Sequence, residues 1–557
     1  MRVISSSPSV ALAALLAGAL LAVDTTSANG RRFYQDDPLS REPETQDASG
    51  VAEWDIELIV DIAINLFGRP GDKQYGQRAG NINTIDEVPD SSWFTNRIGS
   101  RPVSIEEAVK GPVVDTGPAP GRFTVIAQKR AGAAPGFTIR DSAGQVWFVS
   151  FDAVGFPEAA TGAIMVANKI FWTLGYWQIE NHLIAVRPDQ LDIDPNAKFT
   201  PLSGRRRAMA RHDLDEAFER SHRSEDGSYR AAAARGVPGR PVGGFKYYGT
   251  RPDDPNDIVP HEHRRELRAL KVFGAWTNLV DMKAGNTLDS VITTNGRGSV
   301  RHYLQDVGST FGTGAQGPRE FDEGWEYLVQ LKKATKRLFL FGFPLEPWHT
   351  ADYADNEGIG RFEGTAFDPP AWKPRVPTAA FLHARLDDSF WAARRVAAFS
   401  DEMIRAMVKA GGYSQPSDEK LLADVLIQRR DKVVSYYFNA INPLVEFSLS
   451  NEGRLSFRNA AVDAGVGKPP EQGYRATWST FDNTTGNSTL IGSPTSGPGT
   501  EIPSSGALPS ASGTFVKIGI VAVGPVPKPW TEPVDVYFRR VATGWQLVGV
   551  DRMPSPQ

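Results

Sequence analysis

Asp281, Lys283 and Asn286 stand in the pattern Asp-x-Lys-x-x-Asn, and Asp306-Val-Gly308 follows further along the chain. Phosphoryl transfer uses these residue types at this spacing. A carboxylate orients or deprotonates the attacking hydroxyl, an ammonium offsets charge on the moving phosphoryl, and amide and carboxylate oxygens hold metal ions. We therefore predict that Asp281 and Lys283 are catalytic and that Asn286 and Asp306 are metal ligands. The alternative is an acidic loop that only caps helices.

The segments around this motif have the patterns of elements that would position it. Residues 264–280 carry apolar residues at helical spacing, so a helix is expected to deliver the loop. Downstream, two strand-like segments, 288–294 and 299–305, flank Asn295-Gly296, a pair that tolerates the positive φ of a tight hairpin turn. Such a hairpin folds the chain back, so we expect Asp306 to return to the neighbourhood of Asn286.

A second candidate region lies upstream, where residues 122–129, 137–141 and 145–151 have strand patterns and 131–136 forms a small-residue loop. Glycines let backbone N–H groups approach phosphates without a Cβ in the way, which makes Gly132 and Gly136 candidate nucleotide-binding residues. An ordinary hairpin is the alternative. Residues 157–175 then have the pattern of an amphipathic helix with a Pro start and a Gly stop.

The order of these predicted elements resembles the atypical branch of the protein-kinase-like superfamily. It runs from the strands and the small-residue loop through the helix to the motif loop, the hairpin and Asp-x-Gly. The wider chain, notably residues 81–99 and 263–289, resembles uncharacterised secreted bacterial proteins with a kinase-like core. The resemblance covers about residues 120–440. It implies a two-lobed fold and a cleft for ATP or another nucleotide with Mg²⁺ or Mn²⁺, and it identifies no acceptor.

One position departs from the kinase pattern. The third strand of a kinase carries a Lys that binds the α- and β-phosphates and pairs with a Glu on the following helix, whereas the matching residue here is Ser150. Glu158 is the only acid of the helical segment and would be that Glu. Either the chain is a pseudokinase, or a neighbouring Lys has taken the role. Lys129, beside the small-residue loop, is the best placed candidate, and Lys169 on the helix is a weaker one.

The first residues predict export. Met1-Arg2 is followed by an apolar run, 10–23, that is short for a membrane span, and by a small-residue cleavage site at 26–28. We expect a signal peptide, an extracytoplasmic (periplasmic or secreted) location and no stable membrane span after cleavage; a signal anchor is the alternative. The chain contains no cysteine, which excludes disulfides and thiolate metal sites and suits a bacterial envelope.

Composition and patterning complete the outline. The net charge of −4 gives no reason to expect nucleic acid as a partner. We predict an α+β fold: a two-lobed protein-kinase-like core with an N-terminal extension and a small C-terminal β-rich domain. The predicted boundaries are 1–28 for the signal peptide, 29–111 for the extension, 112–187 and 188–443 for the two lobes, and 444–557 for the β-rich domain, with 490–513 as a loop or linker by composition.

Two function classes follow. An active protein would transfer phosphoryl, or nucleotidyl, groups from the nucleotide to a hydroxyl of an exported protein, a glycan or a small molecule. An inactive one would be a pseudokinase-like binding or scaffold protein of the envelope. The sequence contains no G-x-S-x-G elbow, Walker loop or H-E-x-x-H zinc motif. Trp530 and Trp545 in the β-rich domain are expected to be core aromatics, with carbohydrate platforms as the alternative.

Overall fold

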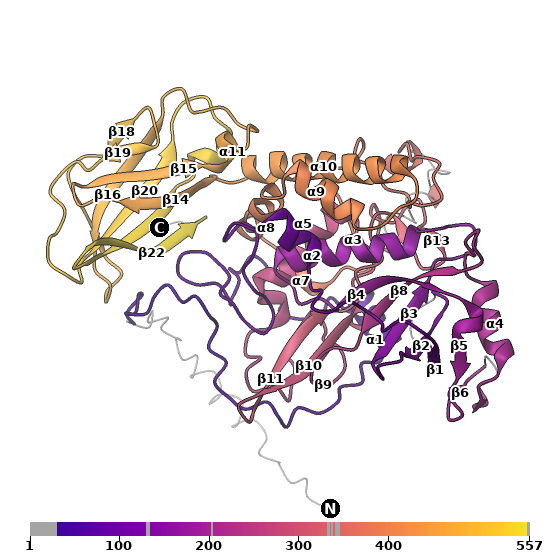
Figure 1. Ribbon diagram of the computed structural model, residues 1–557. Coiled ribbons are helices and arrows are strands. Elements are labelled where there is room, and N and C mark those ends of the chain that lie inside the picture. Colours follow the sequence, from indigo (N-terminus) through magenta and orange to yellow (C-terminus); the bar gives the residue numbers. More distant parts are fainter. Residues whose placement is uncertain are drawn as a thin grey trace, which may run out of the picture.

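The computed structural model describes residues 30–129, 134–201, 204–330, 333, 335, 338–339 and 346–553, which form several sheets and a layer of helices (Figure 1). The predicted α+β class is confirmed. The predicted signal peptide and Gly132 lie outside the described residues. Within the described ranges, no helix is both long and apolar enough to cross a membrane.

A six-stranded sheet, called here the N-terminal sheet, has the strand order β4-β8-β3-β2-β1-β5. Only the β1–β5 pair is parallel. Alternate residues such as Val125, Ile139 and Trp147 are buried, as the strand patterns predicted. Because β5 and β8 belong to this sheet, it extends past the predicted lobe boundary at residue 187. The strands are β1 (Phe123–Gln128), β2 (Gly136–Arg140), β3 (Val146–Phe151), β4 (Asn181–Val186), β5 (Leu191–Ile193) and β8 (Tyr229–Arg235).

Helix α3 (Ala159–Leu174) connects this sheet to the helices beyond it. It packs against β3, β4 and β8 on one side and against α2 and α9 on the other. Most of its residues are buried, so the helix predicted over 157–175 is a central one. It ends at Gly175, whose φ of 127° is a conformation that favours glycine.

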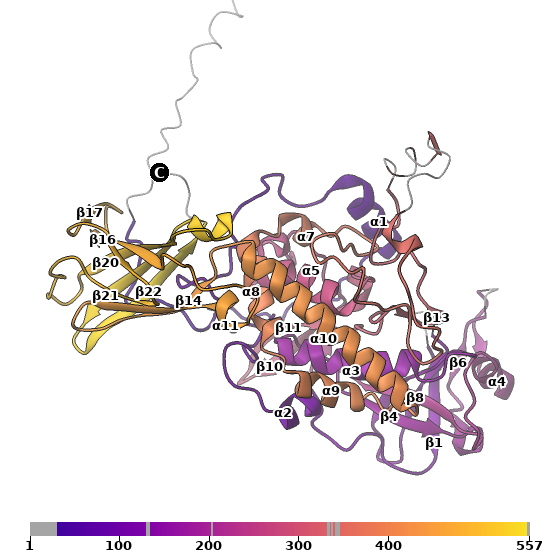
Figure 2. The same cartoon turned by 90° about the horizontal axis from the view of Figure 1, so that it is seen from above.

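The remaining large helices form a layer, called here the helical body, around α5 (Arg265–Thr277). The apolar face predicted for α5 is buried, including Leu267, Phe273 and Trp276. The long helix α10 packs on α5, α8 and α9 and runs across the top of the layer (Figure 2). The other members are α7 (Ala379–His383), α8 (Leu386–Ala397), α9 (Asp401–Lys409) and α10 (Pro416–Asn439).

The hairpin predicted after the motif loop is present. Strands β10 (Thr287–Thr294) and β11 (Arg297–Leu304) pair antiparallel along their whole length. Asn295 and Gly296 form the turn with φ of 53° and 77°, the positive values that such a two-residue turn requires. Thr287 lies opposite Leu304, so the residues that follow β11 lie beside the motif loop.

The N-terminal extension wraps the core over a long path. It holds α1 (Leu58–Ala63), the π-helical turn η1 (Ile64–Gly68) and α2 (Ile105–Lys110). The usual polarity of an amphipathic helix is inverted here, since Asp61 is buried while Ile59 and Phe67 are 83% and 63% exposed. Asp61 faces inward because the Tyr248 hydroxyl donates to its carboxylate at 3.0 Å.

The part of the chain from β14 onward, called here the C-terminal domain, contains two antiparallel sheets, β14-β15-β19 and a larger one built on β17-β16-β20-β21-β22. Trp530 is 1% exposed and therefore a core residue. Short strands occupy part of the predicted linker 490–513. The elements are β14 (Leu444–Leu449), β15 (Arg454–Asn459), α11 (Ala460–Asp463), β16 (Tyr474–Phe481), β17 (Ser488–Leu490), β18 (Thr495–Gly497), β19 (Glu501–Pro503), β20 (Phe515–Ala522), η6 (Lys528–Thr531), β21 (Val534–Val541) and β22 (Gly544–Arg552).

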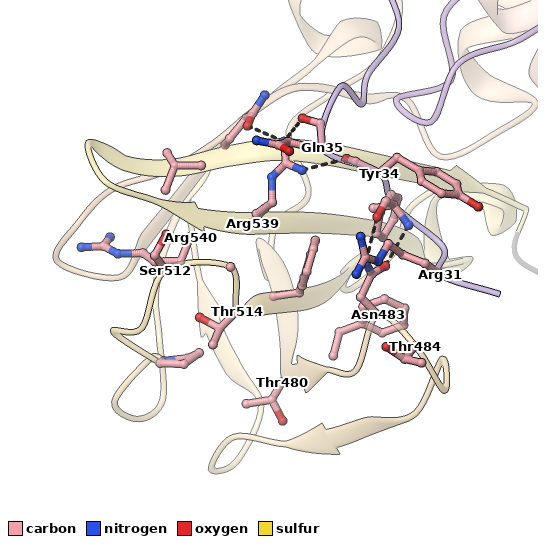
Figure 3. Close-up of a pocket in the computed structure, with 17 residues that line it drawn as sticks. Arg31, Tyr34, Gln35, Thr480, Asn483, Thr484, Ser512, Thr514, Arg539 and Arg540 are labelled. Atoms are coloured by element: carbon pink, nitrogen blue, oxygen red, sulfur yellow. Dashed lines mark hydrogen bonds between the residues drawn. The ribbon is translucent and has the colours of Figure 1, made fainter. Parts of the chain in front are cut away.

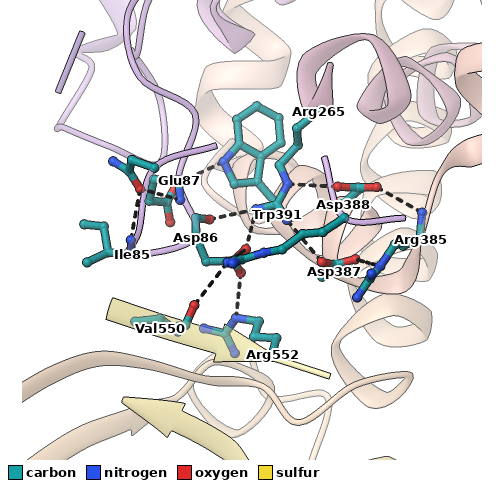
Figure 4. Close-up of polar contacts among 12 residues, drawn as sticks. Ile85, Asp86, Glu87, Arg265, Arg385, Asp387, Asp388, Trp391, Val550 and Arg552 are labelled. Atoms are coloured by element: carbon teal, nitrogen blue, oxygen red, sulfur yellow. Dashed lines mark hydrogen bonds and ion pairs between the residues drawn. The ribbon is translucent and has the colours of Figure 1, made fainter. Parts of the chain in front are cut away.

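A buried ionic network joins the extension, the helical body and the C-terminal domain (Figure 4). Arg265 of α5 forms ion pairs with Asp86 of the extension at 2.8 Å and with Asp387 and Asp388 of α8 at 3.3 and 2.9 Å. Arg552 of β22 contacts the same Asp86 at 3.3 Å. This network, called here the junction network, therefore fixes the three parts relative to one another.

Short elements complete the chain. They are η2 (Pro188–Gln190), β6 (Lys198–Phe199), β7 (Arg207–Ala208), α4 (Arg211–Glu219), β9 (Arg240–Pro241), η3 (His261–His263), η4 (Ala284–Asn286), β12 (Thr313–Gly314), β13 (Gly317–Pro318) and η5 (Pro347–His349).

Candidate functional site

The motif loop begins where α5 ends. Asn278 closes the helix in the left-handed conformation, with a φ of 54°. The chain then turns so that Lys283 Nζ donates to Asp281 Oδ2 at 2.7 Å, and Asn286 Nδ2 donates to the carbonyl oxygen of Asp281 at 2.6 Å. The three motif residues therefore form one hydrogen-bonded unit at the C-terminus of a buried helix.

Asp306 returns to this unit, as the hairpin predicted. The backbone N–H groups of Gln305 and Asp306 both donate to the carbonyl oxygen of Asn286, at 3.0 and 3.1 Å. Gly308 N donates to Asp306 Oδ1 at 3.0 Å. A Cβ on Gly308 would lie 2.8 Å from Ile164 Cγ1 of α3, so the glycine of the Asp-x-Gly segment allows this segment to pack closely under α3.

Two side-chain oxygen donors for a cation come from this unit and from the segment that returns to it. The amide nitrogen of Asn286 is used by Asp281, which leaves its side-chain oxygen for a ligand, and the Asp306 carboxylate is exposed. Across the described ranges, no group of three or more acidic or imidazole side chains could hold a metal by itself. The donor set therefore fits Mg²⁺ or Mn²⁺ shared with phosphate oxygens and water, which is how nucleotide-bound magnesium is usually held.

Cations surround the carboxylate of Asp281. Burial opposes its ionisation, but the Lys283 ammonium at 2.7 Å and the Arg319 guanidinium at 3.8 Å outweigh burial and hold the pKa of Asp281 below its usual value. Asp281 is therefore ionised at neutral pH. It can accept a hydrogen bond from a hydroxyl and orient it, while its low basicity limits proton removal before the transition state.

Ser150 is neutral where a kinase has a lysine, and the side chain of Lys129 extends to Ser150. Its Nζ donates to Ser150 Oγ at 2.7 Å. The register of the sheet explains the reach, since Gly136 of β2 pairs with Ser150 of β3. A Cβ on Gly136 would overlap the carbonyl oxygen of Val149 and lie 3.3 Å from Lys129 Cδ. The glycine at position 136 therefore allows β2 and β3 to pair closely and leaves space for the side chain of Lys129.

The negative charge of Asp306 acts on Lys129 electrostatically. Burial lowers the pKa of Lys129, and the negative charge of Asp306 partly opposes this effect. The lysine beside the N-terminal sheet and the carboxylate after β11 thus influence one another electrostatically, although they are far apart in the sequence.

Glu158 does not hold the place predicted for it. It is the N-cap residue of α3, with a φ of 65°. Its carboxylate accepts from Ser414 N at 2.8 Å and lies 3.6 Å from Arg230 Nη1. The predicted Lys129–Glu158 ion pair is therefore wrong. The physical reason is that α3 begins one residue after Glu158, so this side chain projects from the end of the helix and not from the face toward Lys129.

Arg319 is a site residue that the sequence analysis did not identify. Besides its approach to Asp281, it lies 3.6 Å from Glu323, and its Nε is buried without a hydrogen-bond partner among the described residues. Its segment has no periodic pattern and no motif, so the sequence contains no feature that would have placed it beside Asp281.

No protein-family model, no curated protein and no solved structure matches this chain. The assignment of a function to the site therefore depends on its own residues and geometry.

Proposed function

We propose that the protein is an exported, atypical kinase-like phosphotransferase. It binds ATP or another nucleotide with Mg²⁺ or Mn²⁺ in the cleft between the N-terminal sheet and the helical body and transfers a phosphoryl group to a hydroxyl acceptor. The acceptor is an exported protein, a glycan or a small molecule.

One observation carries this proposal. A kinase needs a phosphate-binding cation at the position of its strand lysine, and in this chain that position is Ser150. Lys129 Nζ lies 2.7 Å from Ser150 Oγ. A lysine from the neighbouring strand would thus supply the missing charge. The electrostatic influence of Asp306 on the pKa of Lys129 supports the same assignment.

The distribution of the site residues over the fold also supports the proposal. Lys129 belongs to the N-terminal sheet, which with α3 would be the smaller lobe of a kinase-like core. Asp281, Asn286 and Asp306 belong to the helical body and its hairpin, which would be the larger lobe. A nucleotide between them would have a cation on one side and metal ligands on the other.

The chemistry assigns a role to each residue. Asn286 and Asp306 would hold the metal ion, which neutralises phosphate charge when bound. Asp281 would accept a hydrogen bond from the acceptor hydroxyl, whose oxygen forms a bond to the γ-phosphorus while the bond to the bridging oxygen breaks. The hydroxyl proton passes to Asp281, the nucleoside diphosphate leaves, and Lys283 offsets charge on the transferred group.

One observation favours a second function, that of a nucleotide-binding or scaffold protein without transfer. Glu158 is bound to Ser414 and Arg230, so no carboxylate of α3 fixes the lysine that binds the phosphates. A loosely held lysine can support affinity while it positions the γ-phosphoryl poorly for transfer.

Thermal unfolding with and without nucleotide and metal tests the proposal. A ligand that binds only the folded state at about 100 times its Kd stabilises that state by about 2.7 kcal/mol. We expect stabilisation by ATP with Mg²⁺ or Mn²⁺, its loss in Asp306→Asn, and no change in the control Asp192→Asn, an exposed carboxylate paired with Arg122 on the N-terminal sheet.

A label-transfer assay with γ-labelled ATP and envelope extract separates the two functions. Stabilisation with transfer supports the phosphotransferase. Stabilisation without transfer to any acceptor or to water supports the binding protein. No stabilisation by any nucleotide, with either metal, contradicts the proposal.

A further inference from the structure

A cavity of about 840 Å³ opens on the C-terminal domain where the first described residues cross its larger sheet (Figure 3). Its walls come from residues 31–35 and from neighbouring ends of β16, β20, β21 and β22. None of its lining residues belongs to the candidate phosphotransferase site described above. A volume of this size suits a ligand of several rings and exceeds what a small inorganic ion needs.

The cavity carries positive charge that its walls do not neutralise. Arg31, Arg539 and Arg540 line it, and no Asp or Glu does. In the described part of the chain none of the three forms an ion pair, whereas Arg454 and Arg458 of the same domain are paired with carboxylates. Uncompensated arginines around a concave surface raise the local concentration of anions.

Two of these guanidinium groups are held in place by neutral partners. Arg539 donates to the carbonyl oxygens of Tyr34 and Gln35 at 2.7 and 3.0 Å and to Gln546 Oε1 at 2.9 Å. Arg540 donates to Asn451 Oδ1 at 2.6 Å. These bonds fix the cations without neutralising them, so a bound anion would pay little additional ordering entropy.

The other lining groups match a ligand with hydroxyl groups and flat apolar faces. Thr480, Thr484 and Ser512 supply hydroxyls that can donate and accept hydrogen bonds. Tyr34, one of the lining residues, is 57% exposed, and an exposed aromatic residue offers a surface against which a sugar ring can lie. The deeper wall is aromatic, because Phe33 stacks on Phe515 with centroids 5.9 Å apart.

The position of the cavity disfavours an extended peptide. Peptides that bind sheets by main-chain pairing add a strand along a free edge. This cavity instead lies across the ends of four adjacent strands, where β16, β20 and β21 are each already paired on both sides. Recognition there must use side chains.

We propose that this cavity binds an acidic saccharide, in which carboxylate groups are carried on hydroxyl-bearing rings. Arg31 and Arg540 contact the carboxylates, which arginine recognises well through paired N–H donors. Tyr34 contacts a ring face. The inference does not rest on the proposed phosphotransferase function, since the two sites share no residue.

Titration calorimetry of the full chain tests this inference. The probes are tetragalacturonate, the neutral galactose tetramer and tetra-aspartate. We expect binding of tetragalacturonate that weakens as salt is added. Its affinity should fall about 100-fold or more in the double variant Arg31→Gln, Arg540→Gln, because each of the two lost charged contacts removes about 1.4 kcal/mol, which is tenfold in affinity. Tyr34→Ala should also weaken it.

The control is Arg475→Gln, an exposed arginine of β16 outside the cavity, which should bind as the wild type does. Circular dichroism shows whether each variant is folded. The proposal is overturned if tetragalacturonate does not bind, if the neutral tetramer binds equally well, or if the double variant binds unchanged. Tighter binding of tetra-aspartate would assign the cavity to acidic peptides and overturn it too.

Discussion

The candidate site and the junction network are both built from charged side chains, yet these charges are arranged differently in the two regions. In the junction network the side chains of Arg265, Asp387 and Asp388 are fully buried and each charge meets an opposite one. At the candidate site the Asp306 carboxylate is exposed, and Lys129 has a hydroxyl and not a carboxylate as its hydrogen-bond partner.

This difference separates structural from functional charge. Buried charges that are fully paired hold parts together, and removing one leaves the others uncompensated. Charges that keep an open coordination position are available to a ligand and contribute little to stability. Variants in the two regions should therefore have opposite effects on stability and activity.

The largest effect is expected from Arg265→Ala. The variant leaves Asp86, Asp387 and Asp388 without their shared arginine, and breaking a buried ion pair costs about 3 to 5 kcal/mol of unfolding free energy. Urea unfolding measures this loss. The control Arg187→Ala breaks an exposed pair with Asp226 and should change stability by no more than about 1 kcal/mol. Equal small losses in both variants would show that the junction network is not structural.

Asp281→Asn should lower the rate of transfer and leave stability close to that of the wild type. The group that orients the acceptor hydroxyl is lost, so transfer from a nucleotide should fall by about 100-fold or more, while the affinity for nucleotide should stay close to that of the wild type. Initial rates and binding titrations measure the two quantities. An unchanged transfer rate would remove Asp281 from the chemistry.

Gly136→Ala tests the packing that lets Lys129 reach Ser150. The added methyl group would overlap the Val149 carbonyl oxygen and crowd the lysine side chain. Overpacking of this kind costs about 1 to 3 kcal/mol, and nucleotide affinity should fall with it. Gly50→Ala is the control, because a Cβ there meets nothing within 4 Å. Melting temperatures of the two variants should differ, and identical values would contradict this account of β2.

The smallest effect is a dependence of nucleotide affinity on pH. Burial lowers the pKa of Lys129 from the ordinary value of 10.5, so the ammonium loses its proton at a lower pH than a free lysine does. Affinity for phosphates should therefore weaken as the pH rises toward the lowered pKa of Lys129. Titrations from about pH 7 to 10 measure the decline. Lys129→Arg keeps its charge over this range, and if it binds with the same decline, another group is responsible.

Local sequence patterns predicted well the helices and strands that carry the candidate site. The strands around 122–151, the helix that became α5 and the Asn295-Gly296 hairpin all follow from short-range periodicity and turn chemistry. Because the hairpin fixes its own register, the return of Asp306 to Asn286 could also be predicted.

Long-range arrangements could not be predicted in the same way. The misassignment of Glu158 arose from a difference of one or two residues in where α3 begins, which sequence patterns do not resolve. Arg319 and the partners of Arg265 depend on tertiary packing between segments far apart in the chain. The direct contact between Lys129 and Ser150 depends on the strand register, which pairs Gly136 with Ser150.

The central claim is that Lys129 supplies the charge that a kinase carries at position 150. Titration calorimetry with ATP and Mg²⁺ tests it most directly on three proteins: the wild type, Lys129→Ala, and the double variant Lys129→Ala, Ser150→Lys. We predict that the wild type binds, that Lys129→Ala loses binding while remaining folded, and that the lysine at position 150 restores it. Binding that is unchanged in Lys129→Ala, or absent from the wild type, would contradict the claim.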